Sequence, residues 1–209
     1  MDVSAPYRAI APTLDVAVLV ELSRMPAPVS VSALRGRLGR GSDRGLRLAL
    51  DRLAKQGIVR QERAGPIILF ALNNDHIAAP VARMLADLRS RFLQQVRDLI
   101  AGWATQPLHA SLFGSAARRD GNAESDIDLF VVRPHDIDED DEQWRHQLDE
   151  LEERVHAWTG NPVQISELGA GELAELRRDR PAIVDELRRD AIELAGAPVR
   201  RILDNATRQ

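Results

Sequence analysis

Two aspartates, Asp126 and Asp128, stand at the start of an apolar run that extends from Ile127 to Val132. Successive side chains of a β-strand point to opposite faces, so this spacing places both carboxylates on one face of a strand and the apolar side chains on the other. Neighbouring carboxylates repel each other, and each raises the pKa of the other. A hard divalent cation such as Mg²⁺ relieves the repulsion, because it prefers oxygen ligands and binds protein carboxylates together with substrate phosphates. The pair therefore predicts a site for a metal ion and a phosphate.

The residues before this run are also typical of a phosphate site. The segment from Leu108 to Phe113 reads as a strand, a Gly114-Ser115 turn follows, and a short helix begins near Ala116. The start of a helix offers unpaired backbone N–H groups and the positive end of the helix dipole, both of which suit phosphate. Glycine allows close approach of the backbone, and the serine hydroxyl can donate to a phosphate oxygen. Arg118 adds positive charge in the next turn.

The order Gly-Ser, Ala-Arg and Ser-Asp-Ile-Asp-Leu resembles the signature of the nucleotidyltransferases that share the DNA polymerase β palm fold, and most closely the minimal nucleotidyltransferases. The resemblance implies a transferase that moves a nucleoside monophosphate, with AMP from ATP expected first, to a hydroxyl on a protein, an RNA or a small molecule. Mg²⁺ or Mn²⁺ would be the cofactor, and positioning and charge neutralisation would supply the catalysis. The residues implied are Gly114, Ser115, Arg118 and Ser125 for the nucleoside triphosphate, and Asp126 and Asp128 for the metal and catalysis.

The third carboxylate of the resembling family has no direct counterpart in this sequence. Active members usually supply it from a later strand, and the candidate strand here, from Asn161 to Leu168, carries Gln164 at the matching position. A neutral amide is a weak metal ligand and no base. Glu167 is the remaining candidate for a third catalytic carboxylate, although simple alternation places it on the face opposite Gln164.

The N-terminal region has a different character. Helices are predicted from Thr13, over Ser32 to Leu38 and over Ser42 to Gln56, and a strand, a turn and a second strand follow. This pattern, with a basic face on the third helix, resembles the winged helix-turn-helix family over roughly residues 13 to 73. The resemblance implies binding of double-stranded DNA, with the third helix in the major groove. The expected DNA-binding residues are Arg44, Arg47, Lys55, Arg60 and Arg63. The alternative is a domain with solvated surface charges that mediates only protein contacts.

An amphipathic helix is predicted to connect the two regions, with apolar residues at helical spacing between residues 78 and 103. It would pack on the second domain or form the seam of a homodimer. The expected fold class is thus α+β. The expected domains are a winged helix over residues 1–75, a connecting helix over 76–104, and a nucleotidyltransferase-like domain with C-terminal helices over 105–209.

Composition narrows the remaining function classes. The chain has no cysteine, which excludes disulfides and thiolate zinc sites, and it has no apolar run of the roughly 20 residues that span a bilayer. We therefore expect a cytoplasmic protein that does not enter the membrane. Three hypotheses follow: a nucleotidyltransferase coupled to DNA binding, a DNA-binding transcriptional regulator that binds nucleotide without turnover, and an antitoxin-type component that modifies a partner protein.

Overall fold

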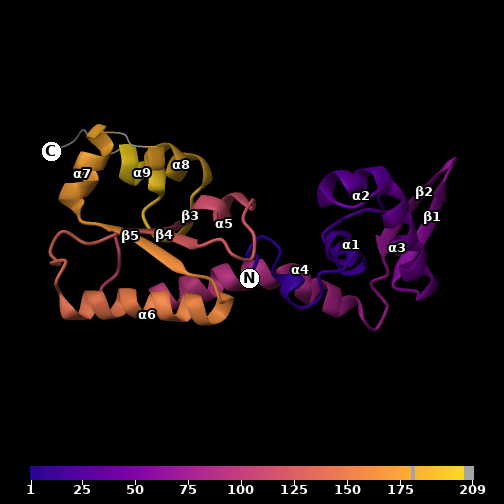
Figure 1. Ribbon diagram of the computed structural model, residues 1–209, viewed down its shortest axis with the longest axis horizontal. Coiled ribbons are helices and arrows are strands. Elements are labelled where there is room, and N and C mark those ends of the chain that lie inside the picture. Colours follow the sequence, from indigo (N-terminus) through magenta and orange to yellow (C-terminus); the bar gives the residue numbers. More distant parts are fainter. Residues whose placement is uncertain (180–181, 205–209) are drawn as a thin grey trace. The chain divides into compact units, whose positions relative to one another are not determined.

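The computed structural model describes residues 1–179 and 182–204, and it has an α+β fold with helices and two sheets (Figure 1). The chain divides into two compact units. One comprises Ala5–Arg89, and the other comprises Met1–Ser4 together with Ser90–Gln209. The helix α4 (Ala79–Ala101) contributes its first half to the former unit and its second half to the latter. No helix in the described residues is long and apolar enough to cross a membrane.

The unit Ala5–Arg89 contains three α-helices before α4 and a β-hairpin. Three hydroxyl side chains begin the helices: Thr13, Ser30 and Ser42 each accept a hydrogen bond from the backbone N–H three residues further on. The elements begin and end close to the residues expected from the sequence. They are η1 (Pro6–Ala9), α1 (Leu14–Ser23), α2 (Val31–Leu38), α3 (Asp43–Lys55), β1 (Val59–Ala64) and β2 (Ile67–Leu72).

The apolar residues of α3 hold this unit together. Leu46, Ala49, Leu50 and Leu53 recur at helical spacing and are all buried. They pack in one cluster with residues of α1, α2 and the antiparallel hairpin β1–β2. Because one face of α3 is used for this core, its opposite face is exposed to solvent.

The other unit is built on a four-stranded sheet with the strand order β5-β4-β3-β6. The parallel pair is β4 and β5, while β3 runs antiparallel to both β4 and β6. The strands of this sheet are β3 (His109–Phe113), β4 (Ile127–Val132), β5 (Val163–Leu168) and β6 (Ile192–Gly196). The helices are α5 (Gly114–Arg118), α6 (Glu142–Thr159), α7 (Ala170–Asp179), α8 (Ala182–Asp190) and α9 (Val199–Asp204).

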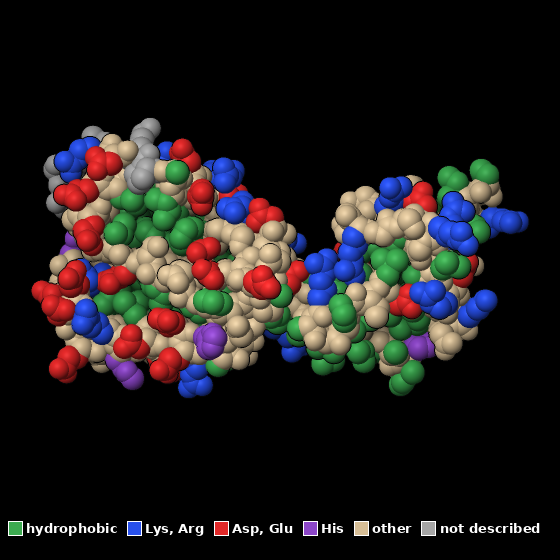
Figure 2. Space-filling model, viewed as in Figure 1, with side chains coloured by type: hydrophobic (Ala, Val, Ile, Leu, Met, Phe, Trp, Pro, Cys, Tyr) green, Lys and Arg blue, Asp and Glu red, His purple; other side chains and the backbone are tan. Residues whose placement is uncertain are grey.

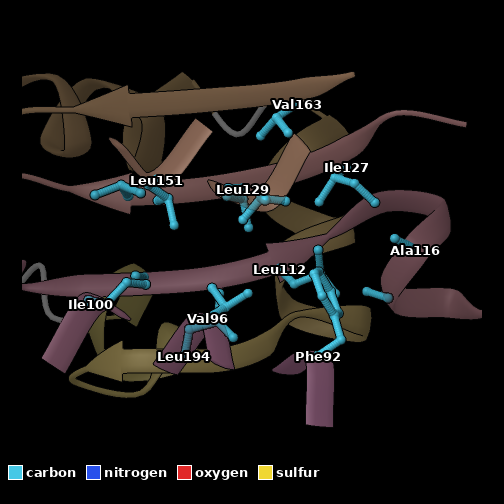
Figure 3. Packing of buried hydrophobic residues seen from close by; sticks show 14 of the residues in the cluster. Phe92, Val96, Ile100, Leu112, Ala116, Ile127, Leu129, Leu151, Val163 and Leu194 are labelled. Carbon is cyan, nitrogen blue, oxygen red and sulfur yellow. The ribbon is translucent and has the colours of Figure 1, made fainter. Parts of the chain in front are cut away.

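The two faces of the sheet are buried against different helices. Ile127, Leu129 and Val131 of β4 pack in one cluster with side chains of α4 and α6 (Figure 3). Phe130 and Val132 pack in another cluster with residues of α7, α8 and α9. Because side chains alternate along β4, Asp128 shares the face of Phe130 and Val132. This alternation decides which groups can reach Asp128.

A buried histidine joins β3 to the end of β6. His109 is fully buried; its Nδ1–H donates to the carbonyl of Ala197 (2.7 Å), and its Nε2 accepts from the hydroxyl of Ser111 (2.9 Å). Burial lowers the pKa of His109 below its ordinary value of 6.5, against smaller opposing effects of the Ala197 carbonyl and the Glu193 charge. The folded protein therefore holds this imidazole neutral.

We predict that His109 makes the protein less stable in acid. Below about pH 6.5 the unfolded chain takes up a proton that the folded chain resists, so the free energy of unfolding falls as the pH is lowered. Urea unfolding at pH 5 and pH 7 measures this loss, and it should be smaller in His109→Gln than in the wild type. His146→Gln, which changes an exposed histidine of α6, is the control and should keep the wild-type loss. Equal losses in all three proteins would contradict the prediction.

Candidate functional site

The site begins where β3 ends and β4 starts. Phe113 and Asp128 are paired across the antiparallel strands, so Gly114 lies beside the Asp128 carboxylate. The backbone of Gly114 has a φ of 66°, a conformation that favours glycine. A Cβ at this position would overlap the carboxylate of Asp128. Glycine is therefore required both by the turn and by the acidic side chain that packs on it.

The two aspartates form an electrostatically strained pair. Asp128 is partly buried, whereas Asp126 precedes β4 and is exposed. The pKa of Asp128 is raised above the ordinary aspartate value of 3.8, first by burial, then by the charge of Asp126, with a smaller contribution from Glu186. Arg118 opposes this rise. The site thus has unbalanced negative charge that a cation would neutralise.

Two serines and a glycine form the loop next to this pair. The Oγ atoms of Ser115 and Ser125 lie 3.0 and 3.2 Å from the point where a Cβ of Gly121 would stand, so glycine lets both hydroxyls approach the loop. The hydroxyl of Ser125 accepts from the backbone N–H of Asn122 (2.9 Å). Ser125, predicted to bind nucleotide, therefore also holds its own loop together.

Arg118 reaches the same edge of the sheet from α5. Its Nε donates to Asp120 (3.0 Å), and its Nη1 lies 3.9 Å from a carboxylate oxygen of Glu186 and 4.0 Å from one of Asp190, both on α8. Such partly exposed ion pairs contribute little to stability. The charge of Arg118 also acts on Asp128, so the guanidinium lies near this aspartate.

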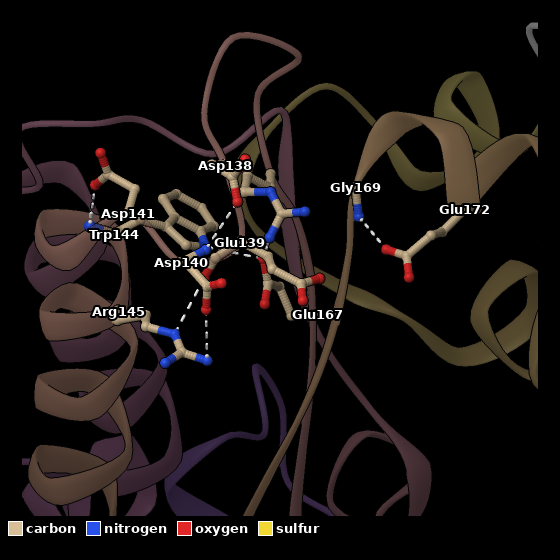
Figure 4. A network of polar contacts seen from close by, with 10 residues as sticks. Asp138, Glu139, Asp140, Asp141, Trp144, Arg145, Glu167, Gly169 and Glu172 are labelled. Atoms are coloured by element: carbon tan, nitrogen blue, oxygen red, sulfur yellow. Dashed lines mark hydrogen bonds and ion pairs between the residues drawn. The ribbon is translucent and has the colours of Figure 1, made fainter.

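The structure separates Gln164 from Glu167. Gln164, which stands at the position expected for the third acid, is paired with Asp128 in the parallel register of β4 and β5. Glu167 lies on the other face, where its Oε1 accepts from Nη1 of Arg133 (2.6 Å) and Nε1 of Trp144 (2.9 Å), as Figure 4 shows for Trp144. The expectation that Glu167 completes the carboxylate set is therefore corrected, because strand alternation and these two donors keep it on the α6 face.

The set of protein ligands for a metal is small. Among residues 1–179 and 182–204, no three or more His, Asp or Glu side chains are grouped to hold a metal ion. Asp126 and Asp128 nevertheless suit one Mg²⁺, since this ion commonly takes one or two carboxylates and fills its other positions with phosphate oxygens and water. The raised pKa of Asp128 and its close packing on Gly114 fit such a cation.

The sequence reasoning missed three residues of this region. Glu186 and Asp190 lie in the region for which the sequence predicts only C-terminal helices, and nothing in the sequence distinguishes the acids that lie near Arg118 from those that face solvent. Asn161, placed at the start of a strand, instead precedes β5 and is buried. The only signal for Asn161 in the sequence is that it follows Gly160, a glycine typical of the end of a helix.

The unit Ala5–Arg89 carries a basic surface. Its sequence has 13 Lys and Arg residues against 7 Asp and Glu residues, and Figure 2 shows blue side chains gathered on its visible face. Arg44, Arg47 and Lys55 are exposed on α3, and Arg63 is exposed on β1. Arg60 is also exposed, but it forms an ion pair with Asp75.

Comparison with known proteins supports the interpretation of the second unit. Residues 98–176 match the model of the family described as "Polymerase beta, Nucleotidyltransferase". This segment is similar to a nucleotidyltransferase. The match includes Gly114, Ser115, both aspartates and β5, so it covers the site described above. It supports a transferase activity in general terms.

Two solved structures are more distantly similar. "Crystal structure of the toxin-antitoxin with AMP-PNP" is 15% identical, with a TM-score of 0.38, and the likeness covers 54% of this chain and 81% of that chain. Human N-acetylserotonin methyltransferase in complex with SAM is 21% identical, with a TM-score of 0.28, over 44% of this chain and 29% of that chain. Likenesses at these scores carry no conclusion about fold or function. The curated proteins searched gave no match.

We predict that Gly114→Ala lowers the free energy of unfolding more than Gly160→Ala does. Gly160 is the control, because its φ of 71° is similar and a Cβ there would meet nothing within 4 Å. Gly160→Ala should cost about 1 to 2 kcal/mol from backbone strain alone. Gly114→Ala should cost about 1 to 3 kcal/mol more, because the methyl group also displaces the Asp128 carboxylate. Urea unfolding of both variants measures the difference.

The extra cost should depend on Asp128. In an Asp128→Ala background, where the carboxylate is absent, Gly114→Ala should cost no more than Gly160→Ala does. An extra cost that persists in this background would show that contact with Asp128 is not its cause.

Proposed function

We propose that this protein is a Mg²⁺-dependent nucleotidyltransferase that transfers a nucleoside monophosphate, AMP from ATP in the first instance, to the hydroxyl of an acceptor. The observation that carries the proposal is the meeting of Asp126 and Asp128 with the Gly114-Ser115 turn at one sheet edge, inside the segment that matches the nucleotidyltransferase family. Mn²⁺ could replace Mg²⁺, since both prefer carboxylate and phosphate oxygens.

The residues of the site have separate roles in this reaction. Asp126 and Asp128 would hold the metal ion, which supplies neutralisation of the charge that develops on the phosphates. Gly114 and Ser115 would bind the triphosphate, because the glycine admits it close to the backbone and the serine hydroxyl can donate to it. Arg118, already directed to this edge by the acids of α8, would bind a phosphate oxygen.

The chemical step breaks the phosphoanhydride bond between the α- and β-phosphates and forms a phosphoester bond to the acceptor. The acceptor oxygen forms a bond to the α-phosphorus, the bond from that phosphorus to the bridging oxygen of the β-phosphate breaks, and pyrophosphate leaves. The proton of the acceptor hydroxyl passes to solvent, since Gln164, the residue paired with Asp128 across the strands, is no base. The protein contributes position and charge rather than a general base.

Gln164 also favours a second candidate function. If an acid at this position is needed for turnover, the site would bind nucleotide and metal without transferring anything, and the protein would be a nucleotide-sensing regulator. The two functions differ in one observable, which is the covalent transfer of the α-phosphate.

Labelled ATP tests the proposal directly. With Mg²⁺ and a cell extract as the source of acceptor, addition of the protein should increase the labelling of an acceptor by ATP labelled at the α-phosphate. It should not increase labelling by ATP labelled at the γ-phosphate, because the γ-phosphate leaves in pyrophosphate. Asp128→Asn should lower the α-labelling at least 100-fold, since the metal would lose one of its two carboxylates.

Asp138→Asn is the matched control, because it removes an exposed carboxylate from the loop before α6 and should leave labelling unchanged. Labelling that is equal in the wild type and Asp128→Asn would rule out the proposed site. Binding of ATP and Mg²⁺ by the wild type without any labelling would instead support the regulator.

We propose further that the unit Ala5–Arg89 is a winged helix that binds double-stranded DNA. Three helices followed by a hairpin, with Val29 pairing to Phe70 of β2 as an additional strand bridge, support this reading. Arg44 and Arg47 are exposed on α3, the helix that would enter the major groove. The planar guanidinium group suits both phosphates and guanine edges.

The salt dependence of binding tests this proposal. Fluorescence anisotropy with mixed-sequence duplex DNA should show binding that weakens as NaCl is raised. Arg44→Ala combined with Arg47→Ala should weaken binding about 10-fold or more, and each lost phosphate contact should reduce the slope of log K against log[NaCl] by roughly 1.

Arg52→Ala is the control for charge on the same helix, because Arg52 is paired with Asp15 and should change binding little. Wild-type protein that binds no duplex, or a double variant with the wild-type affinity and slope, would refute DNA binding through α3.

A further inference from the structure

A buried amide lies directly behind the candidate metal site. Asn161 follows Gly160 in the turn between α6 and β5, and only 1% of its surface is exposed. Burial of an amide is costly unless its two N–H donors and its carbonyl oxygen are hydrogen-bonded. The hydrogen-bond partners of Asn161 therefore show which parts of the structure the buried amide holds together.

The side chain of Asn161 binds the loop that precedes β4. Its Nδ2 donates to the backbone carbonyls of Ala123 (3.1 Å) and Ser125 (2.8 Å), and its Oδ1 accepts from the amino group of Met1. Both donors are thus directed at the three residues before Asp126. Because hydrogen bonds to backbone carbonyls do not depend on the loop's own side chains, they fix the path of the main chain.

The backbone of Asn161 is itself held in place. Its N–H donates to the hydroxyl of Thr159 (3.2 Å), and its carbonyl accepts from Nδ1 of His156 (2.8 Å). Thr159 in turn donates to the carbonyl of Val155 in α6. The backbone of Asn161 is therefore fixed to the C-terminal end of α6.

The loop needs such support because it carries an exposed ligand. Asp126 lies outside the strand and is exposed, while the next residue, Ile127, donates its N–H to the carbonyl of Pro162 (2.9 Å). Within the loop, Asn122 bonds to Ser125 and to the N–H of Glu124. The bond of Asn161 to Ser125 and the bond of Ile127 to Pro162 therefore attach both sides of Asp126 to the turn between α6 and β5.

We propose that Asn161 is a positioning residue, which holds the loop before β4 so that Asp126 faces the cation that it shares with Asp128. The inference rests on the proposed function, because it assumes a metal ion between the two aspartates. Groups that orient the ligands of a metal are typically worth about 10- to 100-fold in metal affinity. Asn161 supplies this orientation through the backbone of the loop rather than by touching the metal.

Asn161→Asp tests the proposal with little change of shape. The variant keeps an oxygen acceptor for Met1 but removes both N–H donors, and it turns a carboxylate oxygen toward the carbonyls of Ala123 and Ser125. We expect Mn²⁺ to bind about 10-fold or more weakly, measured by electron paramagnetic resonance of free Mn²⁺. Hydrogen exchange of the backbone amides from Glu124 to Ile127 should also become faster without any metal.

Gln147→Glu is the matched control. Gln147 is another buried amide that bonds to backbone, since its Oε1 accepts from the N–H of Thr105 (3.0 Å) and its Nε2 donates to the carbonyl of Thr105 (3.1 Å). This variant should lose thermal stability as Asn161→Asp does, but it should keep the wild-type affinity for Mn²⁺ and the wild-type exchange in the loop.

The outcomes separate this inference from the function on which it rests. Wild-type protein that binds no Mn²⁺ would contradict the proposed function and the inference with it. A wild type that binds Mn²⁺, with Asn161→Asp binding it equally well, would overturn the inference alone. A purely structural role would show the same loss of stability and of Mn²⁺ affinity in both variants, and this result would overturn it too.

Discussion

The repulsion between the carboxylates of Asp126 and Asp128 is the constraint on which the rest of the site depends. One of the two is partly buried and packs directly on Gly114, so it cannot relax fully into solvent. The pKa of Asp128 is raised first by this burial and then by the charge of Asp126, and Arg118 offsets the rise only in part. A divalent cation would relieve this repulsion, and Mg²⁺ commonly binds one or two carboxylates together with phosphate oxygens, which is why the proposed function includes it.

Strand alternation then divides the chemistry of the sheet between its two faces. Asp128 and Gln164 are neighbours in the register of β4 and β5, whereas Glu167 lies with Arg133 and Trp144 on the face that α6 covers. Glu167 therefore connects β5 to α6 through its hydrogen bond with Trp144. Asp126 and Asp128 are therefore the two carboxylates of the candidate site, and the neutral Gln164 lies beside Asp128.

Much of this was predictable because local sequence determines it. The helix caps, the hairpin, the strand that carries the aspartates and the glycine turn all follow from spacing within a few residues, and the structure confirms these elements. Gln164, expected at the position of the third acid of the resembling family, is paired with Asp128 in the register of β4 and β5. The expected site residues Gly114, Ser115, Arg118 and Asp128 come together at one edge of the sheet.

The parts that sequence could not supply depend on contacts between distant segments. Glu186 meets Arg118 only because α8 packs against α5, and Asn161 meets the carbonyls before Asp126 only because a turn and a loop far apart in sequence lie together. Glu167 is the candidate from sequence because it is the carboxylate left on the strand of Gln164. The partners that hold it, Arg133 and Trp144, lie more than 20 residues away along the chain. Periodicity predicts the face on which a side chain lies, but it does not predict which side chains from distant segments contact it there.

A crystal structure with Mn²⁺ and a non-hydrolysable ATP analogue tests the central claim most directly, since anomalous scattering locates Mn²⁺ independently of the model. The account predicts one Mn²⁺ bound by the carboxylates of Asp126 and Asp128 and by the triphosphate, the triphosphate against Gly114 and Ser115, and Glu167 still bonded to Arg133 and Trp144. Mn²⁺ bound elsewhere, or a triphosphate with no contact to Ser115, would contradict it.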